Sequence, residues 1–167
     1  AGINPCQELG GEIFLDENNN GCQDPTEGLI TEDVTVTLYA CTDGNPENGT
    51  PIASTTTNTG MYEFGVNSPN TGADVCLEIG TLYYVGFEFD SSPGAPLQGH
   101  NFSSGETMCV GSADADDIDK DSGLSGCYDP EGDDDDDDID AGINPCQVLG
   151  GTVFYDNNGN GCEDGTE

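Results

Sequence analysis

The residues best suited to chemistry lie in one twelve-residue segment near the start of the chain, DENNNGCQDPTE at positions 16–27. Its spacing matches the pattern D-x-[DN]-x-[DN]-G-x5-E, which is typical of a calcium-binding loop. Calcium takes about six to eight oxygen ligands, and side chains at alternate positions converge on the ion when the chain wraps around it. The matching residues are Asp16, Asn18, Asn20, Gly21 and Glu27.

Each position of this loop has an expected role in holding one ion. The expected ligands are the side-chain oxygens of Asp16, Asn18 and Asn20, the backbone carbonyl of Cys22, Asp24 directly or through water, and both carboxylate oxygens of Glu27. Gly21 permits the sharp turn between them. The alternative is a turn rich in Asn and Gly that binds no metal.

A second copy of the loop shows that the chain contains a repeat. Residues 1–27 and 141–167 are identical at 19 of 27 positions, at an offset of 140 residues. The second predicted ligand set is Asp156, Asn158, Asn160, Cys162, Asp164 and Glu167. A period of this length is too long for a solenoid unit and predicts a whole domain repeated in tandem. We expect residues 1–140 to form one complete repeat, and residues 141–167 to be the opening strand and calcium loop of the next.

The strong acidity of the chain excludes several classes of protein. The chain has 34 acidic residues and one basic residue, Lys120, which gives a formal net charge of −33. Nucleic-acid binders hold phosphates with Lys and Arg, and docking on anionic lipid requires basic clusters, so we expect neither. No run of about 20 apolar residues is present, so we expect no membrane insertion. The start carries no signal-peptide pattern, which indicates a mature chain or an internal fragment.

The acidic residues are concentrated in one region, since residues 114–140 hold 14 of them. Self-repulsion of this size destabilises a compact state, unless the acids are disordered or cations neutralise them. Asp117, Asp119 and Asp121 alternate and can converge on one ion if the segment curls. The Asp run at 133–138 can add ligands from the other side of the same end. We therefore expect several calcium ions per repeat; the alternative is a solvated acidic tail that binds cations diffusely.

An even number of cysteines in a Lys-poor chain indicates a secreted, disulfide-bonded protein, located outside the cell or on its surface. One period contains Cys6, Cys22, Cys41, Cys76, Cys109 and Cys127, and the second copy of the opening adds Cys146 and Cys162. Spacing alone does not choose their pairing. Zinc is disfavoured, because the chain has no C-x2-C pair and His100 is its single histidine. Two sequons, at Asn48 and Asn101, predict N-linked glycans.

Apolar periodicity predicts β-strands and no helix. Residues 33–41 place Val34, Val36 and Leu38 on one face and threonines on the other, which is the period of a half-buried strand. Further strands are predicted at 11–15, 52–57, 61–66, 75–79, 81–89 and 107–110. The segment 58–60, Asn-Thr-Gly, lies between two of these and predicts a hairpin turn. About seven short strands with turn signals between them predict an all-β sandwich.

Several of these segments together resemble the B domain of the SD-repeat (serine–aspartate repeat) proteins. The matching segments are GEIFLDENNNGCQDPTEG at 11–28, the strand at 34–38, TTTNTGMYEF at 55–64, GTLYYVGFEF at 80–89, and the acidic loop and final strand at 114–123 and 138–143. The resemblance covers essentially the whole repeat, in the family's order. It implies an immunoglobulin-like sandwich of the collagen-binding-protein B (CnaB) type. Such domains repeat in tandem on cell surfaces, bind several calcium ions each and form stiff stalks.

Two features of the chain depart from that family. The repeat carries six cysteines, where the family usually has none. Lys120 is the only candidate donor for an intramolecular Lys–Asn cross-link, and it sits in an acidic loop rather than a core strand, so we expect no such cross-link. Disulfides are our expected replacement for that covalent reinforcement.

These patterns predict an extracellular structural module, stiffened by calcium and disulfides, that builds a rod, stalk or fibre with neighbouring copies or other chains. We expect no enzyme, because no basic residue is available as a clamp and His100, expected in a surface loop, has no evident nucleophile partner. One alternative is an acidic calcium sink or mineral-nucleating matrix protein, and another is a ligand-binding adhesin domain. Halophilic adaptation would explain the acidity but not the spacing of the loop.

Overall fold

The computed structural model describes residues 6–42, 45–57, 59–66, 73–103, 118–119, 123–128, 130 and 139–145 of the chain. This part of the chain forms strands and connecting turns, without a helix. Its ten strands make two five-stranded sheets, so the predicted all-β sandwich is confirmed. The number of strands is higher than expected because three of them, β5, β8 and β9, are only two residues long.

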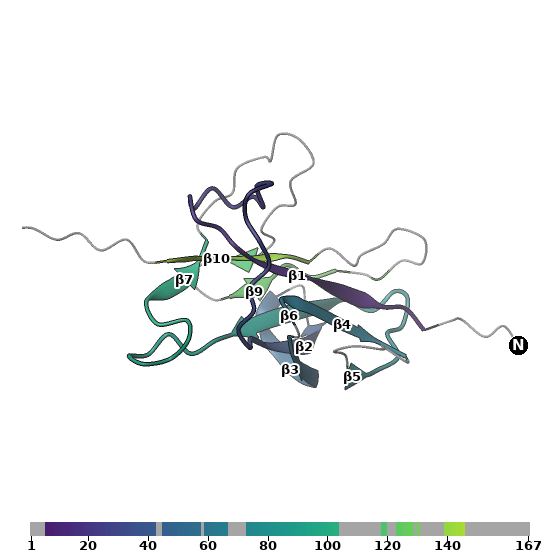
Figure 1. The fold of residues 1–167 in the computed structure, drawn as a ribbon. Helices are drawn as coiled ribbons and strands as arrows, with labels where there is room; N and C mark the ends of the chain where they lie inside the picture. The colour runs from purple at the N-terminus through teal and green to yellow at the C-terminus, as the bar shows by residue number, and fades with distance from the viewer. Residues whose placement is uncertain are drawn as a thin grey trace, which may run out of the picture.

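The first sheet contains the strands that begin and end the described chain. Its order is β5 (Ala73–Asp74), β4 (Met61–Gly65), β1 (Leu9–Leu15), β10 (Ala141–Pro145) and β7 (His100–Phe102). β1 and β10 run parallel, with Ile13 opposite Ala141 and Leu15 opposite Ile143, whereas β10 and β7 are antiparallel. In Figure 1, β1 begins at the right of the molecule and β10 ends at its left.

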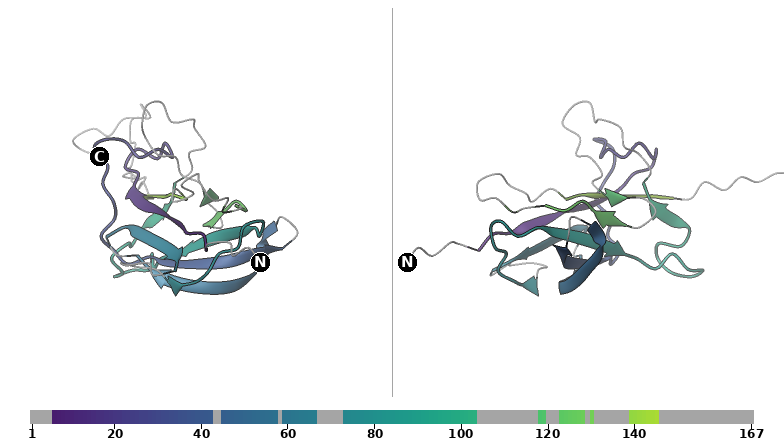
Figure 2. Two further views of the ribbon diagram at one scale, coloured as in Figure 1. Left: turned by 90° about the vertical axis from the view of Figure 1, so that its right-hand side faces the viewer. Right: turned by 180° about the vertical axis from the view of Figure 1, so that it is seen from behind.

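The second sheet is antiparallel throughout and packs against the first. Its order is β3 (Asn45–Thr56), β2 (Thr35–Thr42), β6 (Tyr83–Glu88), β9 (Leu124–Ser125) and β8 (Ile118–Asp119). Figure 2 shows the two sheets as layers that face each other. Tyr62 of β4 and Phe87 of β6 meet edge to face between them, with ring centroids 5.4 Å apart. The core of the protein therefore lies between the sheets.

The predicted alternation is confirmed, because Val34, just before β2, and Val36 and Leu38 within it are fully buried while the threonines between them are not. β6 differs from the prediction, since it is buried on both faces. On its outer face Tyr84 stacks on Tyr39 of β2, with ring centroids 4.7 Å apart and planes inclined by 4°. An aromatic pair therefore covers a surface that alternation predicted to face solvent.

The turn between β3 and β4 is not the hairpin that the sequence predicted. β3 belongs to the second sheet and β4 to the first, so the turn carries the chain from one layer to the other. Thr59 and Gly60 both have positive φ angles, of 60° and 80°. A Cβ atom at Gly60 would lie 2.8 Å from the carbonyl oxygen of Ile13, so glycine is required at this close approach.

The strand predicted at 75–79 is also wrong. The neighbouring strand β5 ends at Asp74, and after it Val75 makes one backbone hydrogen bond to Gly65 while Leu77 forms an isolated bridge to Gln7. The strand predicted at 107–110 lies outside the described residues. β7 and β9 were not predicted, because each is too short to show a period.

The sheet continues across residue 140, where the sequence analysis put the boundary between repeats. β10 follows Asp140 directly and lies between β1 and β7, with Ala141 and Ile143 fully buried. These residues belong to the segment AGINP, which also opens the chain at positions 1–5. The first residues after the expected boundary are therefore part of the same sandwich as β1.

Two disulfides confirm that the chain is cross-linked. Cys6 pairs with Cys76, with Cα atoms 4.8 Å apart, and Cys41 pairs with Cys127, with Cα atoms 6.0 Å apart. Cys22 is also disulfide-bonded, and its partner lies outside the described residues because the other four described cysteines pair with one another. Predicted cysteines 109, 146 and 162 lie outside that part of the chain.

Candidate calcium-binding loop

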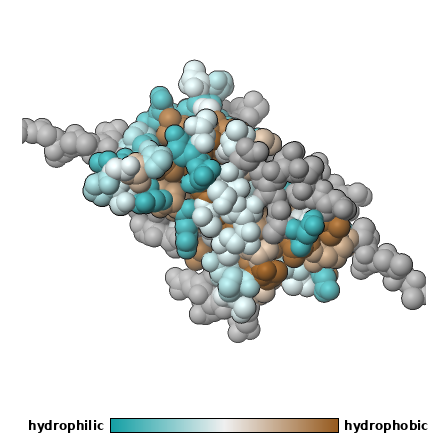
Figure 3. All heavy atoms as spheres, turned by 60° about the horizontal axis from the view of Figure 1, so that its bottom comes forward, coloured by the Kyte–Doolittle hydropathy of each residue, from teal (hydrophilic) through white to brown (hydrophobic). Residues whose placement is uncertain are grey.

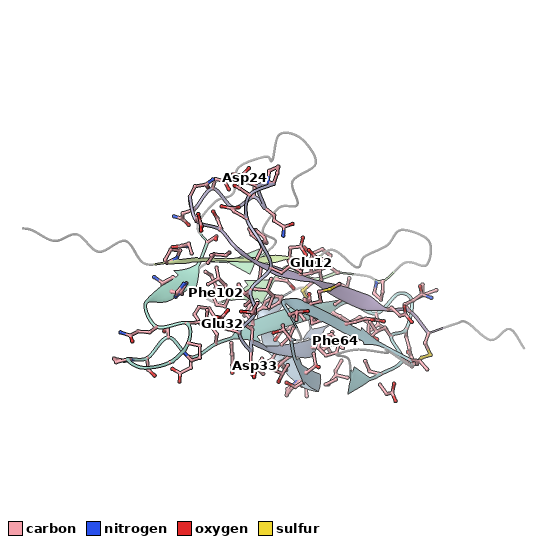
Figure 4. The ribbon with its side chains drawn as sticks, viewed as in Figure 1. Glu12, Asp24, Glu32, Asp33, Phe64 and Phe102 are labelled. Carbon is pink, nitrogen blue, oxygen red and sulfur yellow. A yellow bond between two sulfur atoms is a disulfide. The ribbon has the colours of Figure 1, made fainter. Side chains whose placement is uncertain are left out.

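The predicted loop projects from the end of β1, and hydrogen bonds close its base. The N–H of Leu15 donates to the carbonyl of Gly28 at 2.9 Å, and the N–H of Ile30 donates to that of Ile13 at 2.9 Å. The chain therefore leaves the sheet at Leu15 and returns beside the same strand. Figure 4 shows Asp24 on the projecting loop, above the sheet that carries Glu12.

Asp16 organises the first half of the loop. Its side chain is fully buried, and its carboxylate accepts hydrogen bonds from the N–H groups of Asn20, at 3.1 Å, and Gly21, at 2.8 Å. This curl requires unusual backbone angles, and both Asn19 and Gly21 have positive φ, of 57° and 73°. The glycine predicted to allow the sharp turn does occupy a left-handed conformation.

Asp24 and Glu27 are held by the same kind of contact within the loop. Asp24 Oδ2 accepts from the amide groups of Asn18, at 2.7 Å, and Asn20, at 3.3 Å. Glu27 accepts from the N–H of Glu17 with Oε1 and from the N–H of Asp24 with Oε2, both at 2.9 Å. The loop is thus a closed network in which the carboxylates of Asp16, Asp24 and Glu27 accept hydrogen bonds from the loop itself, while Asp24 and Glu27 stay partly exposed to solvent.

The donor chemistry of the loop fits calcium, although its acidic side chains do not form one cluster in this structure. Among the residues that the structure describes, no group of three or more His, Cys, Asp or Glu that could hold a metal ion is found. All predicted donors are carboxylate, amide or carbonyl oxygens, which calcium prefers. A carboxylate has about four acceptor sites, so Asp16 and Glu27 keep lone pairs beyond their N–H contacts.

Among the described residues, the charge of the loop has no Lys or Arg to balance it. Four acidic residues lie between positions 16 and 27, and the described part of the chain contains neither Lys nor Arg. Hydrogen bonds from neutral N–H groups stabilise a carboxylate but leave its net charge in place. A bound cation would supply the missing positive charge, most of all beside the buried Asp16.

Sequence reasoning missed the residues that anchor the loop to β10. The N–H of Asp16 donates to the carbonyl of Ile143 at 2.9 Å, and the amide of Asn144 donates to Asn19 Oδ1 at 2.9 Å. Asn19 and Asn144 are 125 residues apart. No local pattern points to this contact, although Asn19 stands inside the loop between two predicted ligands.

Most of the other predicted sites fall outside the description. The residues not described include Asp117, Asp121, the run at 133–138 and the whole second loop at 156–167. The side chains of Asp119 in β8 and Asn48 in β3 are not described either. Asp140, the last acid of that region, is buried and accepts a hydrogen bond from the N–H of Glu12 at 2.8 Å. At least this acid has a structural role.

Asn101 and His100 lie in β7. The side chain of Asn101 is exposed, as a glycosylated residue requires, and the glycan itself stays a prediction. His100 is half-buried in this strand and not in the surface loop that we expected, with Nδ1 3.2 Å from the carbonyl of Gln98.

Comparisons with protein families and with curated proteins identify no relative of this chain. A scan against models of protein families finds no match, and a search of the curated proteins finds none either. In the part of the chain that the structure describes, no helix is long and apolar enough to cross a membrane. The likeness to SD-repeat B domains therefore rests on the sequence motifs alone.

Proposed function

We propose that the chain is an extracellular structural module, repeated in tandem, in which calcium and disulfides stiffen a CnaB-type sandwich that builds a rod, stalk or fibre. The observation that carries the proposal is the loop at 16–27. The carboxylates of Asp16, Asp24 and Glu27 accept hydrogen bonds within the loop, it has no Lys or Arg partner among the described residues, and it is anchored on the strand that leads out of the sandwich. Nothing in this arrangement requires catalysis.

Calcium would be held by the predicted ligand set of the loop. Asp16, Asp24 and Glu27 would supply charge, and the oxygens of Asn18, Asn20 and Cys22 would complete the shell. Further ions would bind the acidic segment at 117–121 and the second loop at 156–167. Binding to the folded state alone adds free energy of folding, so the ions would stabilise the module as well as stiffen it.

The disulfides support an extracellular location, because such bonds persist mainly in oxidising compartments. The proposed partners are neighbouring copies of the module, other chains in a fibre, and N-linked glycans at Asn48 and Asn101. Ser103, the third residue of the second sequon, is buried in the folded protein. Asn101 would therefore be modified before this part of the chain folds.

Calorimetric titration of the chain with calcium tests the proposal. We expect the unmodified chain to show a tight site that Asp16→Asn and Glu27→Gln both weaken at least tenfold, because each removes a charged ligand. Glu88→Gln is the matched control, since it removes the same charge from an exposed strand position. Equal isotherms for all four proteins would refute the loop as a site.

The same titration separates the two alternatives. Numerous weak sites without a tight one would favour a calcium sink or a mineral-nucleating matrix protein. An adhesin would need an exposed binding surface, but Tyr84 is buried against Tyr39. The face shown in Figure 3 is mostly polar or neutral, with apolar colour in separate small areas.

A further inference from the structure

We infer that each copy of the segment AGINP belongs to the sandwich before it, so that one folded unit spans residues 6–145 and not 1–140. We call such a unit a bead. The inference rests on the proposed tandem organisation but not on calcium binding. Its partner is a second copy of the same unit, joined without a linker.

The position of β10 is the first line of evidence. This strand fills the interior of the first sheet, with β1 on one side and β7 on the other. Ile143 is fully buried and belongs to the core. Without β10, both neighbouring strands would expose unpaired N–H and C=O groups and the core would be open. A bead that ended at residue 140 would lack an inner strand.

The fit of the segment is specific. A Cβ atom at Gly142 would lie 2.6 Å from Ser103 Oγ and 3.1 Å from the ring of Phe14, so this position requires glycine. Residues 1–5 are identical to 141–145, including this glycine and the buried isoleucine. Residues 1–5 themselves lie outside the described residues, and their proposed role follows from this identity. They have the sequence of a final strand for a preceding bead.

The start of the bead is the second line of evidence. Cys6 is tied to Cys76 by a disulfide, and the N–H of Gln7 donates to the carbonyl of Leu77 at 3.1 Å. Both residues are therefore part of the sandwich, and Cys6 is the first residue after the first copy of AGINP. The equivalent of Cys6 in the next copy is Cys146, which follows Pro145 directly. The segment from Cys6 to Pro145 uses the whole period of 140 residues, and none remains for a linker.

The direction of the strands fixes how beads would follow one another. β1 and β10 are parallel, so the chain enters the first sheet at one end and leaves it at the other, as Figure 1 shows. The next bead would start at the residue after Pro145 and run in the same direction. Tandem beads would then form a line of constant polarity, with the loop at 16–27 anchored on the outgoing strand through Asn144.

A matched pair of substitutions in the two identical segments tests the inference. We expect Ile143→Asp to lower the melting temperature of the 167-residue chain by about 10 °C or more, because it places an unpaired charge in the core. Ile3→Asp makes the same change in the first copy, and we expect a shift below about 2 °C. Both are measured in excess chelator, so that the result does not depend on calcium.

A milder pair covers the case in which Ile143→Asp does not fold. Ile143→Val should still lower the melting temperature by about 2–4 °C, and Ile3→Val should not change it. Equal shifts from both positions, or a larger shift from position 3, would overturn the inference and restore a unit that begins at residue 1. If the substitutions behave as expected but no tight calcium site is found, the bead boundaries stand and the proposed calcium loop is refuted.

Discussion

The two ends of β1 are held in different ways. Before the strand, Cys6 is bonded covalently to Cys76. After it, the loop at 16–27 is held by hydrogen bonds between carboxylates and N–H groups, with charge that nothing in the described chain neutralises. The first end should therefore keep its geometry in any non-reducing solution, whereas the second should respond to cations. β1 therefore connects a covalently fixed end to an end whose stability should depend on bound cations.

Removing the covalent attachment is expected to have the largest effect. The double substitution Cys6→Ser with Cys76→Ser should lower the free energy of unfolding by about 4 kcal/mol, because the disulfide closes a long loop in the unfolded chain. Urea unfolding measures the loss. Calcium affinity of the loop should stay unchanged, and a parallel fall in affinity would show that the two ends are not independent.

Asp16→Ala should have the next largest effect. It leaves the N–H groups of Asn20 and Gly21 without their acceptor, at a cost of about 2 kcal/mol in chelator. In calcium, the difference from the unmodified protein should grow, since the substitution also removes a ligand. Glu88→Ala, at an exposed position, should change stability by less than about 0.5 kcal/mol. Equal effects of the two changes would contradict the assigned role of Asp16.

Asn144→Ala should loosen the loop with a smaller effect on overall stability. The side chain donates to Asn19 Oδ1 and to the carbonyl of Phe102, so about 1 kcal/mol should be lost. Hydrogen exchange should become faster in residues 16–27. Thr37→Ala removes one side-chain hydrogen bond in the second sheet and is the control. Unchanged exchange in the loop would show that β10 does not anchor it.

The smallest expected effect is a pH dependence of stability that comes from Tyr84 in the second sheet and not from either end of β1. Burial raises the pKa of Tyr84 above its ordinary value of 10.0; Tyr39 adds to the rise, and a hydrogen bond with the backbone of Gly49 opposes it. The folded state therefore holds this proton more tightly. Its contribution to stability is complete below about pH 10 and is lost as the pH rises through the folded-state pKa.

Thermal melting at alkaline pH measures this contribution. Tyr84→Phe should flatten the fall in melting temperature that begins at about pH 10, because it removes the titrating hydroxyl. An unchanged slope would assign the fall to other groups. The substitution should leave calcium binding at the loop as it is.

Patterns within one segment predicted the corresponding structure well. The alternation of Val34, Val36 and Leu38 predicted the buried face at the start of β2, and the glycine of the loop takes the expected backbone conformation. Such patterns are visible in the sequence because the period of apolar residues is set within one continuous segment. The closed network of the loop follows equally from side chains within twelve positions of one another.

Features made by distant residues were not predictable in this way. β7 has three residues, and its place in the sheet depends on β10, about forty positions away. The turn at 59–60 has the composition of a hairpin, but packing places its two strands in different sheets. The contact of Asn19 with Asn144 has no local signal either. These three features depend on packing between segments far apart in the sequence, and the spacing of residues within one segment carries no information about it.

The parallel pairing of β1 and β10 has a mechanical consequence. If tension is applied at Cys6 and at Pro145, it pulls the start of β1 and the end of β10 in opposite directions along their common axis. The hydrogen bonds between these strands are then sheared together and do not open one after another. A line of such units would resist stretching until a whole ladder fails, and the disulfide at Cys6 would limit how far the chain extends when it does.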